Sequence, residues 1–106
     1  MHKSGVLAVG DVVLSPATHE VTRAGERIKL NAKEFALLEY FMRHPNQVLT
    51  RERIENHIWS YDFISASNVV DVYVRRLRRK LDDPFEIKLL ETVYGAGYRL
   101  RTLETR

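Results

Sequence analysis

The chain has 106 residues, no cysteine, a formal net charge of +3 and a sequence pI of about 9.4. This length accommodates one domain with a modest core, and a hydrophobic content of 44% excludes wholesale disorder. The absence of cysteine excludes disulfide frameworks and Cys-based zinc sites, and no apolar run reaches the roughly 18 residues of a membrane span. We therefore expect a cytoplasmic domain with no membrane attachment, whose clustered positive charge suits an anionic partner.

The first thirty residues carry the signals of a small antiparallel sheet. Residues 6–14 mix apolar side chains around a turn at Gly10, and residues 18–23 and 27–30 flank a second turn at Gly25. β-Branched residues on both sides of a glycine-bearing turn favour a hairpin. We expect two short strands followed by a hairpin.

Two helices are predicted next. Asn31 and Glu34 have the spacing of a capping box, so a helix is expected to start at Asn31 and to end before Pro45. Phe35, Leu38 and Met42 form its expected buried stripe, with Leu37 and Phe41 beside it. Val48–Leu49 could form a short strand, and Thr50 can cap a second helix over 51–59. In that helix the inward-facing candidates are Ile54, Ile58 and Trp59.

The stretch from Ser67 to Leu81 has a helical period with two contrasting faces. One face is an apolar seam of Val70, Val74, Leu77 and Leu81, flanked by Tyr73. The opposite face collects Asn68, Val72, Arg75 and Arg79, with Arg76 beside them. Five of the six residues from Arg75 to Lys80 are basic, and none is acidic, whereas solvated helices usually alternate in sign. A helix of this kind can pack its apolar side on a core and enter the major groove of DNA; the alternative is a solvated surface helix.

A second hairpin is expected after this helix. Asp82 and Asp83 are expected just outside the helix end, because acidic residues are unfavourable at a helix C-terminus. Residues 87–93 and 98–101 then flank a turn with two glycines. Two helices, the second one basic, followed by a hairpin predict a winged helix-turn-helix. The connection over 60–66 is longer than a tight turn and indicates a variant of that motif.

Four segments carry a family resemblance: 30–38, 51–59, 68–78 and 91–100. Together they resemble the winged-helix effector domain of OmpR/PhoB-type bacterial response regulators, and the resemblance extends over roughly residues 6 to 103. It implies an α+β fold with an N-terminal four-stranded antiparallel sheet, three helices and a C-terminal β-hairpin wing. We interpret residues 1–5 as a linker or an expression remnant, and 6–104 as the winged-helix domain.

The resemblance also implies a mechanism and partners. In this family the third helix enters the major groove of double-stranded DNA, the wing reaches the adjacent minor groove, and two copies bind direct repeats head to tail. A receiver domain, phosphorylated by a sensor kinase, raises the dimeric fraction, and a loop contacts RNA polymerase. This chain contains no receiver domain, so we expect an isolated effector domain, monomeric without DNA, that needs no cofactor.

The resemblance and the helical geometry together give the candidate DNA contacts. On the third helix they are Asn68, Val72, Arg75, Arg76, Arg78 and Arg79. Arginine can grip guanine or phosphate, and the sequence does not decide which. Asn68 could instead cap the helix, and Val72 could touch a thymine methyl group or be incidentally exposed. Arg78 could contact phosphate or pair with Asp71, and Asp71 itself is expected to be structural.

The family's other contacts correspond to further positions of this chain. The expected DNA-backbone contacts are Thr50, Arg51, Trp59 and Thr92, and the expected wing residues are Tyr94, Gly95 and Arg99. Trp59 could instead be plain core, and Thr92 could serve only in strand pairing. Tyr94 stands where the family usually has arginine, and Asn68 where some members have arginine; Arg99 could compensate on the wing. The expected polymerase-contact loop carries Tyr61, Asp62 and Phe63, with packing onto the core as the alternative for its two aromatic residues.

Enzymatic and metal-binding functions have little support in the sequence. The four histidines lie in four separate segments without helical metal-site spacing, so no metal is expected. Residues 95–97 are too short for a nucleotide-binding loop, and no nucleophile elbow is present. Two alternatives to DNA binding stay open: a protein-interaction module that contacts RNA polymerase, and a winged helix that binds RNA.

Overall fold

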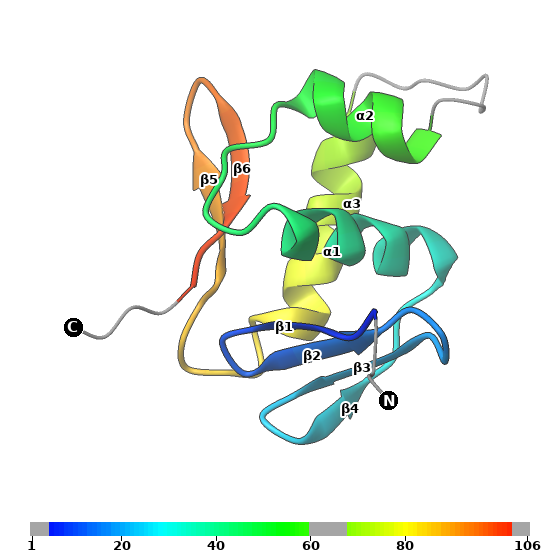
Figure 1. The fold of residues 1–106 in the computed structure, drawn as a ribbon. Helices are drawn as coiled ribbons and strands as arrows, with labels where there is room; N and C mark the ends of the chain where they lie inside the picture. Colours follow the sequence, from blue (N-terminus) through cyan, green and yellow to red (C-terminus); the bar gives the residue numbers. More distant parts are fainter. Residues whose placement is uncertain (1–4, 60–67, 103–106) are drawn as a thin grey trace.

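The computed structural model describes residues 5–59 and 68–102. Its elements, in chain order, are β1 (Leu7–Val9), β2 (Val12–Ser15), β3 (Glu20–Arg23), β4 (Glu26–Ile28), α1 (Ala32–Arg43), α2 (Arg51–Trp59), α3 (Val69–Leu81), β5 (Leu90–Val93) and β6 (Gly97–Leu100). The sheet lies below the helices and the hairpin stands beside them (Figure 1). The predicted α+β winged-helix class is confirmed. Most of the expected linker and the whole expected polymerase-contact loop lie outside the described residues.

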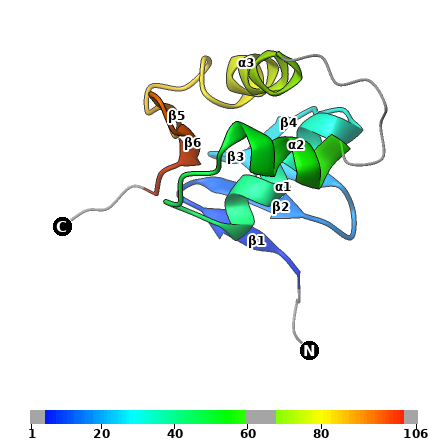
Figure 2. The same cartoon turned by 90° about the horizontal axis from the view of Figure 1, so that it is seen from above.

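The N-terminal sheet is antiparallel throughout, with strand order β1-β2-β3-β4. Along β2, Val12 and Leu14 are buried while Val13 between them is exposed. This alternation places one face of the sheet against the helices, because successive side chains of a strand point to opposite faces. Seen from above, α3 and β1 lie on opposite sides of α1 (Figure 2).

The predicted capping box starts α1. The amide of Glu34 donates to Asn31 Oδ1 at 2.8 Å, and the amide of Asn31 donates to Glu34 Oε1 at 3.0 Å. The Glu34 carboxylate is buried and also accepts a hydrogen bond from Lys80 Nζ of α3 at 2.7 Å. Burial by itself would raise the pKa of Glu34, but the Lys80 ammonium and the Asn31 amide outweigh it and hold that pKa below its ordinary value.

The connection between α1 and α2 joins the helices to the wing. Thr50 caps α2 as predicted, since its Oγ1 accepts a hydrogen bond from the Arg53 amide at 3.1 Å. The short strand expected at Val48–Leu49 is reduced to a single bridge between Leu49 and Tyr98 of β6, with N···O distances of 2.8 and 3.0 Å. The start of α2 is therefore held next to the wing by backbone hydrogen bonds.

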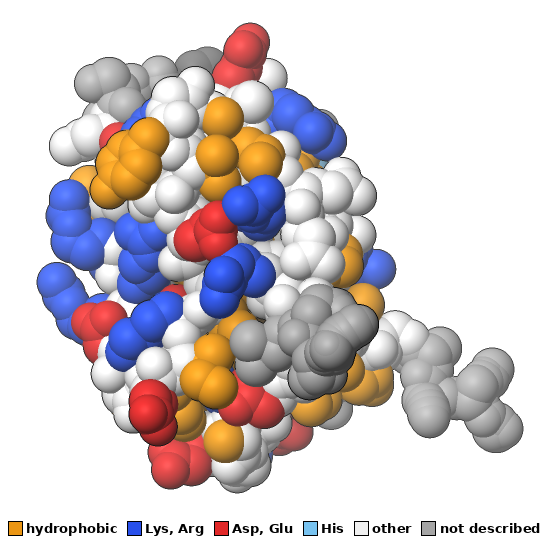
Figure 3. All heavy atoms as spheres, turned by 90° about the vertical axis from the view of Figure 1, so that its left-hand side faces the viewer, with side chains coloured by type: hydrophobic (Ala, Val, Ile, Leu, Met, Phe, Trp, Pro, Cys, Tyr) orange, Lys and Arg blue, Asp and Glu red, His pale blue; other side chains and the backbone are white. Residues whose placement is uncertain are grey.

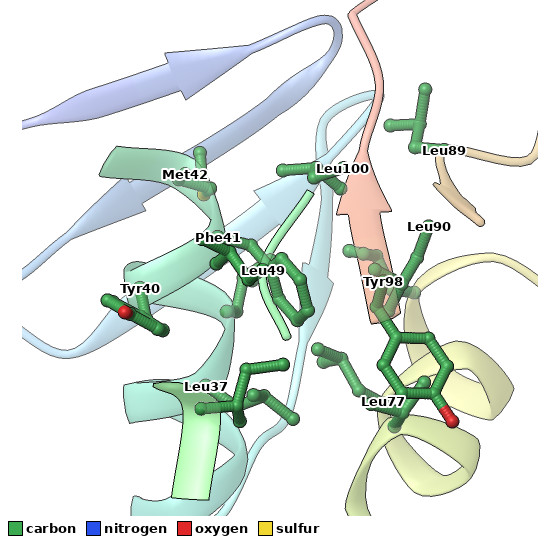
Figure 4. Packing of buried hydrophobic residues seen from close by; sticks show 14 of the residues in the cluster. Leu37, Tyr40, Phe41, Met42, Leu49, Leu77, Leu89, Leu90, Tyr98 and Leu100 are labelled. Atoms are coloured by element: carbon green, nitrogen blue, oxygen red, sulfur yellow. The ribbon is translucent and has the colours of Figure 1, made fainter. Parts of the chain in front are cut away.

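The apolar seam of α3 is buried, as the helical period predicts. Val70, Val74, Leu77 and Leu81 are each at most 2% exposed. Leu77 meets side chains of α1, of the α1–α2 connection and of the hairpin in one cluster (Figure 4). Burying a side chain of this size stabilises the fold by about 1.5–3 kcal/mol, so this face fixes which side of α3 is left for solvent.

A buried ion pair at the end of α3 was not foreseen. The helix ends at Leu81, and Asp82 and Asp83 lie just outside it, as expected. Asp82, however, is buried and accepts a hydrogen bond from the buried Arg23 guanidinium at 2.9 Å. Arg23 Nε also donates to Asp11 at 3.0 Å. This pair joins the N-terminal sheet to the helix end.

The C-terminal hairpin is shorter than predicted. Strand β5 begins at Leu90 rather than at Ile87, and Ile87 is exposed. Asp82 explains the start of the strand, because its carboxylate accepts the amides of Leu89 and Leu90 and holds the chain there. No helix within residues 5–59 and 68–102 is long and apolar enough to cross a membrane.

Candidate nucleic-acid interface

The outward face of α3 is cationic. Arg75, Arg76, Arg79 and Lys80 are exposed on the helix whose opposite side forms the buried seam. Viewed from the side of the hairpin, many of the Lys and Arg side chains gather along the left-hand edge of the molecule (Figure 3). Because the buried seam fixes the rotation of α3, the three arginines point away from the core, whereas the Lys80 ammonium reaches the buried Glu34 carboxylate.

Two of these arginines have neither a hydrogen-bond nor an ion-pair partner among the described residues. Arg75 and Arg79 form no hydrogen bond or ion pair with any residue of 5–59 or 68–102. The Arg76 guanidinium lies 5.1 Å from the ring centroid of Tyr73, a cation–π contact that leaves its donors exposed. All three side chains are therefore placed to accept an anionic partner.

Asn68 and Val72 lie on the same face. Asn68 is exposed at the N-cap position, but its side chain forms no capping hydrogen bond, so the predicted capping alternative is wrong. Only its backbone carbonyl takes part, accepting the Val72 amide at 3.0 Å. Val72 is half-buried. Within the part of the chain that the structure describes, the Asn68 amide group thus has no hydrogen-bond partner.

Arg78 differs from the other basic residues of α3. It is half-buried, its Nε donates to the Leu90 carbonyl at 3.0 Å, and its Nη2 donates to Thr92 Oγ1 at 2.6 Å. The predicted pair between Arg78 and Asp71 is wrong, because both side chains have other partners. Thr92 pairs with Tyr98 across the hairpin, as the alternative for it proposed, and also receives Arg78. Arg78 therefore attaches the wing to α3.

Asp71 is structural, as predicted, but with unexpected partners. Its Oδ1 accepts Arg51 Nε at 2.8 Å and also the Tyr98 hydroxyl. The hydrogen bond from Tyr98, together with the Arg51 guanidinium, holds the pKa of Asp71 below its ordinary value. Burial and the neighbouring Asp71 raise the pKa of the Tyr98 phenol. Asp71 is the only acidic residue between Asn68 and Lys80, which indicates that its carboxylate is paired with another side chain. The neighbouring sequence does not identify that side chain, because both partners lie in other elements.

Trp59 belongs to the core. It is 8% exposed and packs edge-on against Tyr73, with ring centroids 5.1 Å apart. The Lys33 ammonium lies 5.7 Å from a Trp59 ring centroid. This burial favours the core alternative for Trp59 over a direct DNA contact.

The wing presents an aromatic residue at its tip. Tyr94, in the turn between β5 and β6, is 91% exposed, and Gly95 beside it adopts φ +80°. Arg99 forms an ion pair with Glu91, its cross-strand neighbour, and Arg101 Nε lies 3.3 Å from the same carboxylate. Because the charge of Arg99 is already matched by Glu91, Tyr94 rather than Arg99 is the side chain that the tip offers.

Comparison with known proteins identifies the family. A family model described as "Transcriptional regulatory protein, C terminal" matches residues 25–100. The chain is 48% identical over 92 residues to Transcriptional regulatory protein CusR of Escherichia coli (strain K12), covering 87% of this chain and 40% of the relative. It is 44% identical over 95 residues to the uncharacterized transcriptional regulatory protein YkoG of Bacillus subtilis (strain 168), covering 90% and 42%. The chain thus spans about two-fifths of the length of these relatives.

Solved structures give the same result. The DNA-binding domain of CpxR from E. coli matches with a TM-score of 0.78 at 29% identity, covering 93% of this chain and 98% of that one. The Klebsiella pneumoniae RstA DNA-binding domain, in complex with the RstA box, matches with a TM-score of 0.78 at 28% identity, covering 94% and 98%. These matches, with the architecture and the exposed basic face of α3, show that the chain is a winged-helix DNA-binding domain. It belongs to the OmpR/PhoB-type response regulator family.

Proposed function

We propose that this domain binds double-stranded DNA sequence-specifically and thereby regulates transcription, with α3 in the major groove and the wing at the adjacent minor groove. The observation that carries the proposal is the pairing of a buried seam with an exposed basic face on one helix. A protein that neutralises several phosphates gains affinity from counterion release, and a helix of this width fits the major groove.

Direct base reading is assigned to the exposed face of α3. Arg75, Arg76 and Arg79 grip guanine edges or phosphates through bidentate hydrogen bonds. Asn68 reads adenine or bonds a phosphate, and Val72 contacts a thymine methyl group. These roles are supported by the exposure of Asn68 and the three arginines on one helix face, on which Val72 is half-buried.

Backbone contacts are assigned to the elements around α3. Arg51 and the first turn of α2 approach one phosphate, since a helix N-terminus with free amides favours an anion. Arg78 and Thr92, already bonded to each other, lie where α3 meets the wing. At the wing tip, Tyr94 and the glycine after it reach the minor groove.

In the longer protein, we propose that two copies bind direct repeats head to tail and that a receiver domain, phosphorylated by a sensor kinase, controls this pairing. The curated relatives are longer than this chain, which leaves room for an additional domain. The loop with Tyr61, Asp62 and Phe63 contacts an RNA polymerase subunit. It lies outside the described residues, so this role rests on the family resemblance alone.

The test begins with selection of duplexes from a random pool, followed by titration monitored by fluorescence anisotropy. We expect the selected sites to be direct repeats and to bind far more tightly than scrambled duplexes of equal length. The affinity should fall steeply between roughly 50 and 200 mM salt, because the protein contacts several phosphates. No preference for any duplex would refute sequence-specific binding. Tighter binding to RNA of the same sequence, or a salt-independent affinity, would favour the RNA-binding or protein-interaction alternatives.

A further inference from the structure

Asp71 is an acid in the middle of a surface that otherwise attracts phosphate. It is the only Asp or Glu of α3, and its side chain is 33% exposed. A carboxylate at this place opposes DNA binding by simple charge repulsion. Its contacts therefore suggest a purpose that outweighs that repulsion.

Three DNA-facing elements meet at one oxygen of Asp71. The Oδ1 atom of this α3 residue accepts Arg51 Nε, at the first residue of α2, at 2.8 Å. The same atom accepts the hydroxyl of Tyr98 from strand β6 of the wing. The low pKa of Asp71 keeps this carboxylate ionised at neutral pH, so both hydrogen bonds are charge-assisted.

Arg51 is held in one orientation while half of its side chain remains exposed. Its Nε is occupied by Asp71, and its guanidinium carbon lies 5.4 Å from the centroid of the Tyr98 ring. The side chain is 52% exposed. An arginine that is already ordered loses less side-chain entropy when it binds a phosphate, which strengthens the contact.

Tyr98 connects the same site to the wing. Its ring is buried, and its hydroxyl lies at the edge of the core on the side of α3 (Figure 4). Its backbone bridges Leu49, two residues before Arg51. One tyrosine therefore fixes β6 relative to both α2 and α3.

We propose that Asp71 and Tyr98 are positioning residues for DNA binding, which orient Arg51 toward a phosphate and hold the wing at a fixed place beside α3. This rests on the proposed function. Under this proposal Asp71 strengthens DNA binding, although its negative charge alone would weaken it. Loss of the carboxylate releases Arg51, and this outweighs the removed repulsion.

The test is a double-mutant cycle on DNA binding. Asp71→Ala is expected to weaken binding to the selected duplex about three- to tenfold, and to lower the slope of log affinity against log salt by about one phosphate, although it removes a negative charge. In the Arg51→Ala background the same change is expected to weaken binding clearly less than in the wild type, because only the Tyr98 contact that holds the wing is then lost. Glu26→Ala, which removes an exposed acid of β4 outside the proposed interface, is the control for the lost negative charge and is expected to leave binding unchanged or tighten it slightly.

Tyr98→Phe provides an independent variant that keeps the buried ring and removes only the hydroxyl. It is expected to weaken binding by about threefold or more, with urea denaturation showing that the domain is folded at the assay temperature. Unchanged or tighter binding by Asp71→Ala and Tyr98→Phe, or a loss from Asp71→Ala that is equally large without Arg51, would overturn the proposal and leave the two residues a role in stability only. Failure of the wild-type domain to bind any duplex would overturn the proposed function and this proposal with it.

Discussion

Asp82→Ala tests the buried ion pair that joins the sheet to α3. Asp82 and Arg23 are 2% and 1% exposed, with 2.9 Å between Asp82 Oδ1 and Arg23 Nη1. The Asp82 carboxylate also accepts the amides of Leu89 at 3.1 Å and Leu90 at 2.9 Å. The substitution therefore removes one of the acceptors of a buried cation and the side-chain acceptor of two buried amides.

The magnitude follows from what remains around Arg23. Removing one member of a buried pair costs about 3–5 kcal/mol, and each orphaned amide about 1–3 kcal/mol, with sums that are not additive. Arg23 keeps Asp11 at 3.0 Å and the Leu81 carbonyl at 2.8 Å, which limits the loss. We expect Asp82→Ala to lower the free energy of unfolding by about 3–5 kcal/mol, a large part of the roughly 5–15 kcal/mol typical of a domain.

Urea denaturation at pH 7, followed by the fluorescence of the single tryptophan, Trp59, measures this loss. With a slope of about 1–3 kcal/mol per molar urea, the midpoint should fall by roughly 2 M. Asp83→Ala is the control, since Asp83 is exposed, and should change stability by less than about 0.5 kcal/mol. A loss below about 1 kcal/mol for Asp82→Ala, or one equal to that of the control, would refute the assignment of the pair as a structural junction.

Three further results are expected. Arg76→Ala should weaken binding to the selected duplex by about 1–3 kcal/mol and relax one base position; an equal loss on random duplex would make Arg76 a phosphate contact only. Gly97→Ala should abolish or severely impair folding in thermal melts, because a Cβ there would lie 2.1 Å from a carbonyl oxygen of the α1–α2 connection, whereas Gly95→Ala should cost only about 1 kcal/mol, since its Cβ would meet nothing within 4 Å. The folded-state pKa of Asp71 is depressed, so its stabilisation is fully present above its unfolded pKa of about 3.9 and is lost as the pH falls through the folded value. The difference in unfolding free energy between wild type and Asp71→Asn should therefore be constant near pH 7 and shrink below about pH 4; a difference that grows toward acid pH would contradict this.

The elements of the fold could be predicted because their signals are local. The helical period of α3 places Val70 and Val74 on one side and Arg75 on the other, whichever protein surrounds them. The capping box of Asn31 and Glu34 and the hairpin turns likewise involve residues only a few positions apart. The exposed arginines of α3 were found for the same reason.

Which polar side chains meet was decided only by the tertiary structure. Arg23 reaches Asp82 across 59 positions, Arg51 reaches Asp71 across 20, and Arg78 meets Thr92 rather than Asp71. Hydrophobic periodicity reports the face that each element buries, but it carries no information about which charged ends assembly brings within hydrogen-bonding distance. A buried charge must find a partner once water is excluded, so the packed structure selects that partner by proximity rather than by sequence spacing.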